Sequence, residues 1–149
     1  PEGRGSRANP DLPVTNIAYA DAAAYCEWAG GRLPSEAEWE ATARGFGEVA
    51  FPWGHWSATE PVWRGAPDPA RRLLNPASAA GGASTGGHHG LSGNVREWVM
   101  GADGAILKGG SWNTANPADL RISARLIVPG NAPGVDFGFR CARDLEAWP

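Results

Sequence analysis

The spacing of apolar residues predicts two short helices in the first third of the chain. From Tyr19 to Ala29, apolar side chains recur at helical intervals, and Gly30-Gly31 follows as a stop signal. A second helix is expected from about Glu36 to Ala43, because Ser35 and Glu38 stand at the spacing of a capping box.

Strand-like segments occupy the last third of the chain. There are four, Val95 to Val99, Ile106 to Trp112, Leu120 to Val128 and Phe137 to Ala142. Residues 46–90, between the helices and these segments, are rich in Gly, Pro and aromatic residues, and little regular structure is expected there. The pattern therefore predicts a loop-rich α+β fold, with two short helices near the N-terminus and short antiparallel strands toward the C-terminus.

Composition supports a single, loop-rich domain. The chain has 149 residues, of which 19% are charged, 21 are Gly and 13 are Pro. It also has eight Trp, and each indole needs either burial with a partner for its N–H or a place on a binding surface. We expect most of them to be buried anchors, and the acidic side chains of the second helix to form a solvated face.

Charge and hydropathy argue against two classes of partner. The formal net charge is −3 and the only adjacent basic pair is Arg71-Arg72, so neither nucleic acid nor an anionic membrane is an expected partner. No stretch approaches the roughly 20 apolar residues of a membrane span, and the first residues lack the apolar run of a signal peptide. The localisation is left unassigned. Residues 1–12 are interpreted as an irregular lead-in or linker, 13–143 as one domain and 144–149 as a tail.

Four phrases, taken in order, resemble the formylglycine-generating-enzyme (sulfatase-modifying factor) superfamily. They are AYCEWAGGRLPSEAEWE from Ala24 to Glu40, FPWG from Phe51 to Gly54, GLSGNVREW from Gly90 to Trp98, and GGSW from Gly109 to Trp112 leading to GFRCA ending at Ala142. The resemblance implies a C-type-lectin-like fold. Family members usually carry an additional amino-terminal part of the domain, so other parts of a larger polypeptide are expected partners.

The resemblance also shows where the family chemistry should be, and this sequence departs from it there. Family oxidases hold copper(I) with two cysteines, five residues apart, after the Gly-Gly-Ser-aromatic phrase. Thr114 and Asp119 occupy those two positions here. Hydroxyl and carboxylate oxygens are hard ligands that suit copper(I) poorly. Copper is therefore not expected, and no catalytic residue is assigned.

The resemblance implies a disulfide. Cys26 and Cys141 match positions that the family uses to join the first helix to the last strand. The alternative is a pair of buried free thiols, which is favoured if the protein stays in a reducing compartment. A bridge over such a long loop would contribute about 4 to 5 kcal/mol in the chain-entropy model.

The resemblance further implies a structural calcium ion. Gly93, Val95 and Glu97 match three family ligand positions, which supply hard oxygen atoms of the kind that calcium prefers. A fourth position, normally an Asn or Asp, is Gly90 here, so one ligand is lost. In the competing interpretation, Glu97 caps buried loop amides without a metal.

Other chemistry-bearing residues give weaker signals. His88-His89 lies in a Gly-rich loop, where adjacent histidines are poorly spaced to chelate one ion, and His55 stands alone. A solvated loop is the favoured interpretation of these histidines. Ser111 has no evident His and Asp partners in the sequence, so a hydrolytic triad is not supported.

The sequence favours a binding protein over an enzyme. Small or polar residues between the Gly-Gly-Ser-Trp and Gly-Phe-Arg phrases predict a ligand surface on loops of a rigid scaffold, namely Asn113, Thr114, Asn116, Asp119, Arg121, Asn131 and Asp136. In the variable proteins of diversity-generating retroelements, which this family resemblance includes, the equivalent segment is diversified to bind different partners. The expected ligand is a protein, peptide or glycan.

The sequence also allows two alternatives to a ligand-binding function. The first is an oxidoreductase of the sulfoxide-synthase or maturation-oxidase type, which would need iron or another metal from a further domain. The second is a structural accessory module of a larger protein.

Overall fold

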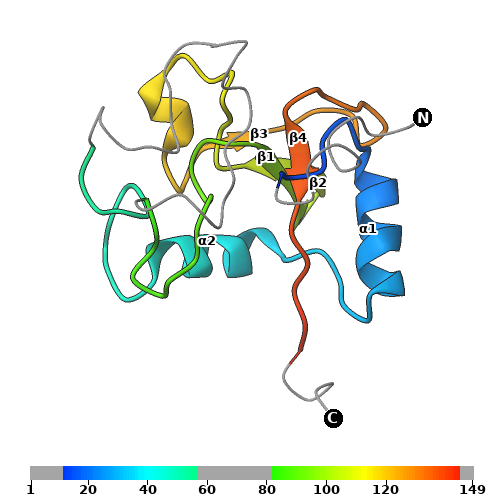
Figure 1. Ribbon diagram of the computed structural model, residues 1–149, viewed down its shortest axis with the longest axis horizontal. Helices are drawn as coiled ribbons and strands as arrows, with labels where there is room; N and C mark the ends of the chain where they lie inside the picture. Colours follow the sequence, from blue (N-terminus) through cyan, green and yellow to red (C-terminus); the bar gives the residue numbers. More distant parts are fainter. Residues whose placement is uncertain (1–11, 57–81, 145–149) are drawn as a thin grey trace.

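The computed structural model describes residues 12–56 and 82–144. The predicted lead-in up to residue 11, the tail beyond 144 and residues 57–81 of the Gly/Pro-rich segment lie outside the described residues. The elements in order are α1 (Tyr19–Trp28), α2 (Glu36–Arg44), β1 (Arg96–Gly101), β2 (Gly104–Lys108), η1 (Pro117–Leu120), β3 (Arg125–Leu126) and β4 (Phe137–Phe139) (Figure 1). None of the helices in the described part is long and apolar enough to cross a bilayer.

Both predicted helices form where the sequence placed them. α1 buries Ala22 and Cys26, one turn apart, against the sheet. α2 begins at a complete capping box, in which the Ser35 hydroxyl accepts from the Glu38 amide and the Glu38 carboxylate accepts from the Ser35 amide. Gly45, with φ of 58°, ends α2.

The sheet is mixed rather than purely antiparallel. Its strand order is β3-β2-β1-β4, and β1–β2 and β2–β3 are antiparallel as expected. β4 instead runs parallel to β1, with Arg96 opposite Phe137 and Trp98 opposite Phe139. The reason lies in the connection from β3, which crosses to the start of α1, where the Gly130 carbonyl accepts from the Tyr19 amide, before it enters β4.

Three predicted strands are shorter than expected. β2 ends at Lys108 instead of Trp112, because Gly109 and Gly110 have φ of 84° and 63°, which no strand accommodates. The segment predicted as Leu120 to Val128 keeps only two strand residues, since Pro117 starts the 3₁₀ helix η1 and the Asn116 side chain caps it. The last predicted strand, Phe137 to Ala142, ends at Phe139, and Ala142 then forms an isolated bridge with Arg32.

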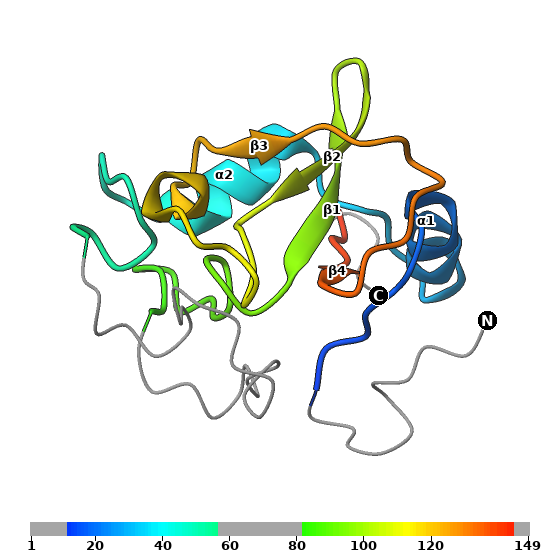
Figure 2. The same cartoon turned by 90° about the horizontal axis from the view of Figure 1, so that it is seen from above.

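The two helices cover opposite faces of the sheet. Alternation along β1 sends Val99 into the cluster that contains Trp39 of α2, and Trp98 into the cluster that contains Ala22 and Cys26 of α1. Figure 2 shows α2 and α1 on either side of β1 and β2. The loops after β2 are thereby fixed at one end of a sheet that is packed on both faces.

Not every aromatic or acidic residue behaves as predicted. Trp39 and Trp98 are buried anchors, but Trp28 on α1 is 81% exposed. The acidic face of α2 is not simply solvated, because Glu36 and Glu40 both bind the ammonium group of Lys108, a side chain that is fully buried. A buried charge requires such partners.

Candidate functional site

Thr114 and Asp119 occupy the positions of the family cysteine pair. Thr114 precedes η1, and Asp119 lies within it. Thr114 is buried, and its hydroxyl accepts a 2.8 Å hydrogen bond from the Ser111 amide and one of 3.2 Å from the Arg96 guanidinium. Asp119 lies within η1 and is exposed. The two side chains therefore have different environments, one structural and one open to solvent.

Beneath η1, a polar network fixes the loop that follows β2. The Ser111 hydroxyl donates to the Asp136 carboxylate and accepts from the Asn113 amide at 3.2 Å. Arg96 adds a positive charge, with its Nε 3.9 Å from Asp136. Because Asp136 is buried and paired, this serine is held as a structural group.

The structure separates the seven residues predicted to contact a ligand. Thr114 and Asp136 are buried in the network beneath η1, so they support the loop instead of facing a ligand. Asn131 is exposed, but it lies in the turn 129–132, which is bound to the start of α1 through the Gly130 carbonyl. The other four are exposed and gather in and around η1. We call these the η1 surface: Asn113, Asn116, Asp119 and Arg121.

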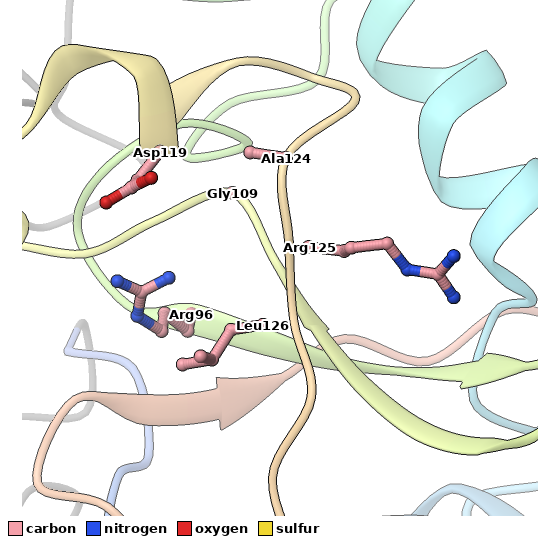
Figure 3. Close-up of a pocket in the computed structure, with 6 residues that line it drawn as sticks. All are labelled: Arg96, Gly109, Asp119, Ala124, Arg125 and Leu126. Atoms are coloured by element: carbon pink, nitrogen blue, oxygen red, sulfur yellow. The ribbon is translucent and has the colours of Figure 1, made fainter.

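A small cavity lies beside η1. It has a volume of about 100 Å³ and is lined by Arg96, Gly109, Asp119, Ala124, Arg125 and Leu126 (Figure 3). The Arg96 guanidinium and the Asp119 carboxylate are turned toward each other, whereas the Arg125 side chain points away toward α2, where it pairs with Glu36 at 3.3 Å. Sequence reasoning missed Arg96, since it stands inside the family phrase GNVREW and no local pattern linked it to η1.

Glu97, the predicted calcium ligand, is bound by protein groups. Its carboxylate accepts from the Trp39 indole at 2.7 Å and from two nitrogens of Arg140 at 2.6 Å each. Burial opposes the charged form of Arg140, but the nearby Glu97 carboxylate outweighs this effect and raises the pKa of Arg140. The partners of Glu97 are thus an indole and a guanidinium, not the loop amides of the competing interpretation.

The same carboxylate faces a cavity that offers oxygen donors. Glu97, Asn94, Val95 and Gly90 line this cavity of about 250 Å³, together with Arg140. Carbonyl and carboxylate oxygens are the ligands that calcium prefers, so the donor set fits the ion, provided that calcium shares Glu97 with Arg140. Gly93, the third predicted ligand, is not among the residues that line the cavity.

The three histidines lie at the surface, and one of them lines the cavity beside Glu97. His55, His88 and His89 are all exposed, and His88 Nδ1 lies 3.3 Å from the Gly86 carbonyl oxygen within its own loop. His89 lines the cavity of about 250 Å³ beside Glu97, and its carbonyl accepts a hydrogen bond from Arg140. Residues 12–56 and 82–144 contain no group of three or more His, Cys, Asp or Glu side chains arranged to hold a metal.

The predicted disulfide is present. Cys26 of α1 and Cys141, two residues after β4, are bonded, with Cα atoms 5.4 Å apart. The alternative of two free thiols is therefore wrong for this structure. Because both cysteine sulfurs of the chain are committed to this bond, they supply no thiolate near Thr114 and Asp119, and the residues there do not fit copper(I).

Comparison with known proteins identifies the family. Residues 1–145 match the family model of the sulfatase-modifying factor enzyme 1-like domain. The chain is 37% identical to the inactive C-alpha-formylglycine-generating enzyme 2 of Mus musculus, over 94% of this chain and 52% of that protein. It is 38% identical to the formylglycine-generating enzyme of Thermomonospora curvata, over 89% of this chain and 46% of that enzyme. The chain thus spans about half the length of these curated relatives.

Solved structures agree on the fold. Treponema denticola variable protein 1 superposes with a TM-score of 0.71 at 16% identity, covering 87% of this chain and 70% of that one. PvdO from Pseudomonas aeruginosa gives a TM-score of 0.70 at 24% identity, covering 91% of this chain and 63% of that one. At such identities the likeness concerns the fold alone, which is the predicted C-type-lectin-like α+β architecture.

Proposed function

Because this chain belongs to the sulfatase-modifying factor enzyme 1-like family, we propose that it is a non-catalytic ligand-binding module on that family's scaffold. Its ligand is a protein, a peptide or a glycan. The binding surface is the η1 surface, where Asn113, Asn116, Asp119 and Arg121 are exposed together. This arrangement is the observation that carries the proposal.

The chemistry of the site supports a non-catalytic role. A hydroxyl that is hydrogen-bonded inside the protein and a solvent-facing carboxylate replace the two thiolates of family oxidases. Neither oxygen suits copper(I). A relative with 37% identity bears the name of an inactive enzyme, which supports the proposal.

The rigidity of η1 supports a binding role. Leu120 at the end of η1 is fully buried, and its carbonyl accepts a 2.7 Å hydrogen bond from the Ser92 hydroxyl. The residues after η1 are also held in place, because the Ile122 amide donates a 2.9 Å hydrogen bond to the Ala50 carbonyl. Polar side chains on a loop that is held in this way lose little conformational entropy when they bind a partner.

A structural calcium ion is a second part of the proposal. Glu97, with the carbonyl of Val95, would hold it at the start of β1, in the cavity that both residues line. When bound, calcium would supply a positive charge that fixes the 90–95 loop. It would not take part in a reaction.

A binding screen tests the proposal. The chain is screened against arrays of glycans, peptides and extracellular or cytoplasmic proteins, and hits are compared with the Asp119→Ala/Arg121→Ala double variant. We expect the double variant to lose binding about tenfold or more. Asn131→Ala serves as the control, because this exposed residue belongs to the same segment but lies beside α1. Equal affinity of the double variant would remove the η1 surface from the proposal.

An activity assay tests the alternative of an oxidase. The chain is incubated with oxygen, copper(I) and a cysteine-containing peptide, and the peptide is examined by mass spectrometry for conversion of the thiol to an aldehyde. We expect no conversion. A Thr114→Cys/Asp119→Cys variant is the informative comparison, because it restores the soft ligands that the family mechanism needs. Turnover by the unmodified chain would overturn the non-catalytic assignment.

A further inference from the structure

We propose that the cavity beside η1 is a subsite for a primary carboxamide, such as the side chain of an Asn or Gln residue in a bound peptide. The inference rests on the proposed binding function and names the chemical group that the η1 surface selects. It comes from the size of the cavity and from the way in which its charged side chains are partnered.

The cavity is large enough to admit a small polar group. The centres of water-sized groups have about 100 Å³ available to them, and one water needs about 10 to 15 Å³ on this measure. The carbon, oxygen and nitrogen of a carboxamide number three heavy atoms and therefore fit. Size alone does not select a carboxamide, so the selection comes from the charged side chains that line the cavity.

The three charged side chains around the cavity, Arg96, Asp119 and Arg125, differ in how far other protein groups neutralise them. Arg96 has the Asp136 carboxylate 3.9 Å from its Nε and donates to Thr114, which leaves further N–H donors free for a ligand. Arg125 is paired with Glu36 outside the cavity. The Asp119 carboxylate has no hydrogen bond or ion pair with any side chain in residues 12–56 or 82–144.

The Asp119 carboxylate is therefore a free acceptor. It faces the Arg96 guanidinium, whose positive charge is already balanced by Asp136. A ligand group with one acceptor and one donor satisfies both: its carbonyl oxygen accepts from Arg96, and its NH₂ donates to Asp119. A carboxylate would be repelled by Asp119, and an ammonium group would leave Arg96 without an acceptor. Ala124 and Leu126 provide an apolar wall for the methylene groups that precede the amide.

The test uses short peptides that differ at one side chain. The probes are N-acetylated, N-methylamide-capped Gly-Xaa-Gly peptides in which Xaa is Gln, Glu, Lys or Leu, so that only the Gln peptide carries a primary carboxamide. Binding to the whole chain is followed by NMR, through the Gly109 and Ala124 amides and the Arg96 Nε–H. We expect the Gln peptide to bind at least about tenfold more tightly than the other three. A preference for Glu or Lys would overturn the assignment.

Two variants link binding to the cavity. Ala124→Leu fills the space without changing a charge, and Asp119→Ala removes the free acceptor; each should weaken the Gln peptide about ten- to a hundredfold. Asp103→Ala, in the exposed turn between β1 and β2, is the matched control and should bind as the unmodified chain does. NMR spectra of the unliganded variants establish that each is folded.

The outcomes separate this inference from the proposed function. If a ligand from the array screen needs Arg121 and Asp119 but is unaffected by Ala124→Leu, the η1 surface stands and the carboxamide subsite is wrong. If the Gln peptide binds and no array ligand depends on the η1 surface, the subsite stands and the wider binding role is wrong.

Discussion

The indole N–H of Trp39 donates a 2.7 Å hydrogen bond to the carboxylate of Glu97, and both side chains are buried. The contact joins α2 to β1. Arg140 binds the same carboxylate from the segment after β4, so a single acidic group connects three parts of the chain. The Trp39 ring therefore lies directly beside the oxygen atoms to which calcium is expected to bind.

Terbium luminescence can test this calcium proposal, because an excited indole transfers energy to a lanthanide bound nearby. We expect excitation of tryptophan to sensitise terbium luminescence, and calcium to compete it away. Calcium at saturating concentration should raise the free energy of unfolding by about 1 to 3 kcal/mol.

Two substitutions serve as a matched pair for this measurement. Glu97→Gln should abolish the luminescence, since calcium and terbium both require a charged oxygen donor. Glu27→Gln, on the exposed side of α1, should leave it unchanged. A calcium-independent melting temperature in the unmodified chain would contradict the proposal.

Local signals in the sequence were sufficient for the helices, and the family resemblance was sufficient for the disulfide, but neither was sufficient for the site. Ser35 and Glu38 specify a capping box within one turn, so the start of α2 was predicted correctly. The pairing of Cys26 with Cys141 came from the family resemblance and is confirmed. These features depend on neighbours in the chain or on a pattern shared by relatives.

The features that sequence reasoning missed depend on contacts between distant residues. Nothing near Asp136 indicates that Ser111 and Arg96, 25 and 40 positions earlier, will enclose its carboxylate. The parallel direction of β4 likewise follows from the path of the 127–136 connection over the start of α1. Polar residues in a loop therefore predicted a surface, although two of them belong to its buried support.

The disulfide should contribute much of the stability of this loop-rich chain. It joins residues that are 115 positions apart, and closing such a loop is worth about 4 to 5 kcal/mol in the chain-entropy model. We expect reduction to lower the free energy of unfolding by about this amount, measured by urea titration with and without a reducing agent.

A Cys141→Ser variant provides the control for this effect. Cys141 is exposed whereas Cys26 is fully buried, so replacing Cys141 opens the bridge without creating a cavity. The variant should be about as stable as the reduced chain and insensitive to the reducing agent. A large further loss on reduction would contradict this explanation.

The turn after β2 should tolerate no side chain at Gly109. A Cβ there would lie 2.8 Å from the Leu91 carbonyl oxygen, and the residue has φ of 84°. We expect Gly109→Ala to cost about 3 kcal/mol or more, because a close contact with backbone adds to the conformational strain. Thermal unfolding monitored by circular dichroism would measure the loss.

A substitution at Gly87 would measure the conformational strain without the close contact. Gly87 also has a positive φ, of 80°, but a Cβ there would meet nothing within 4 Å. Gly87→Ala should therefore cost only about 1 kcal/mol, the conformational part. Equal losses at the two positions would show that the close contact with the Leu91 carbonyl adds nothing to the cost at Gly109.

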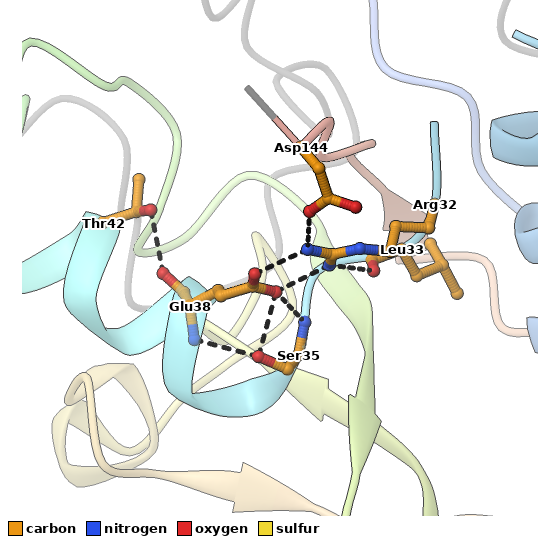
Figure 4. A network of polar contacts seen from close by, with 6 residues as sticks. All are labelled: Arg32, Leu33, Ser35, Glu38, Thr42 and Asp144. Atoms are coloured by element: carbon orange, nitrogen blue, oxygen red, sulfur yellow. Dashed lines mark hydrogen bonds and ion pairs between the residues drawn. The ribbon is translucent and has the colours of Figure 1, made fainter. Parts of the chain in front are cut away.

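The start of α2 should show a defined dependence on pH. Hydrogen bonds from the Arg32 guanidinium and from the Ser35 amide lower the pKa of Glu38 from 4.5 to about 2 (Figure 4). A carboxylate with a lowered pKa in the folded state stabilises the protein at pH values above its unfolded pKa. Its contribution is lost as the pH falls from about 4.5 toward 2. Because 47% of the Glu38 side chain is exposed, solvent screens the pair, and we expect only about 1 kcal/mol at neutral pH.

Glu38→Gln isolates the charge, since Gln also completes a capping box at this position. The variant should be about 1 kcal/mol less stable than the unmodified chain at pH 7, and the difference should shrink steadily between pH 4.5 and pH 3. Salt at 1 M should reduce the difference at pH 7, because the pair is at the surface. If the difference instead stayed constant down to pH 3, the ion pair with Arg32 would not be its source, and the hydrogen-bonding geometry of the cap alone would account for it.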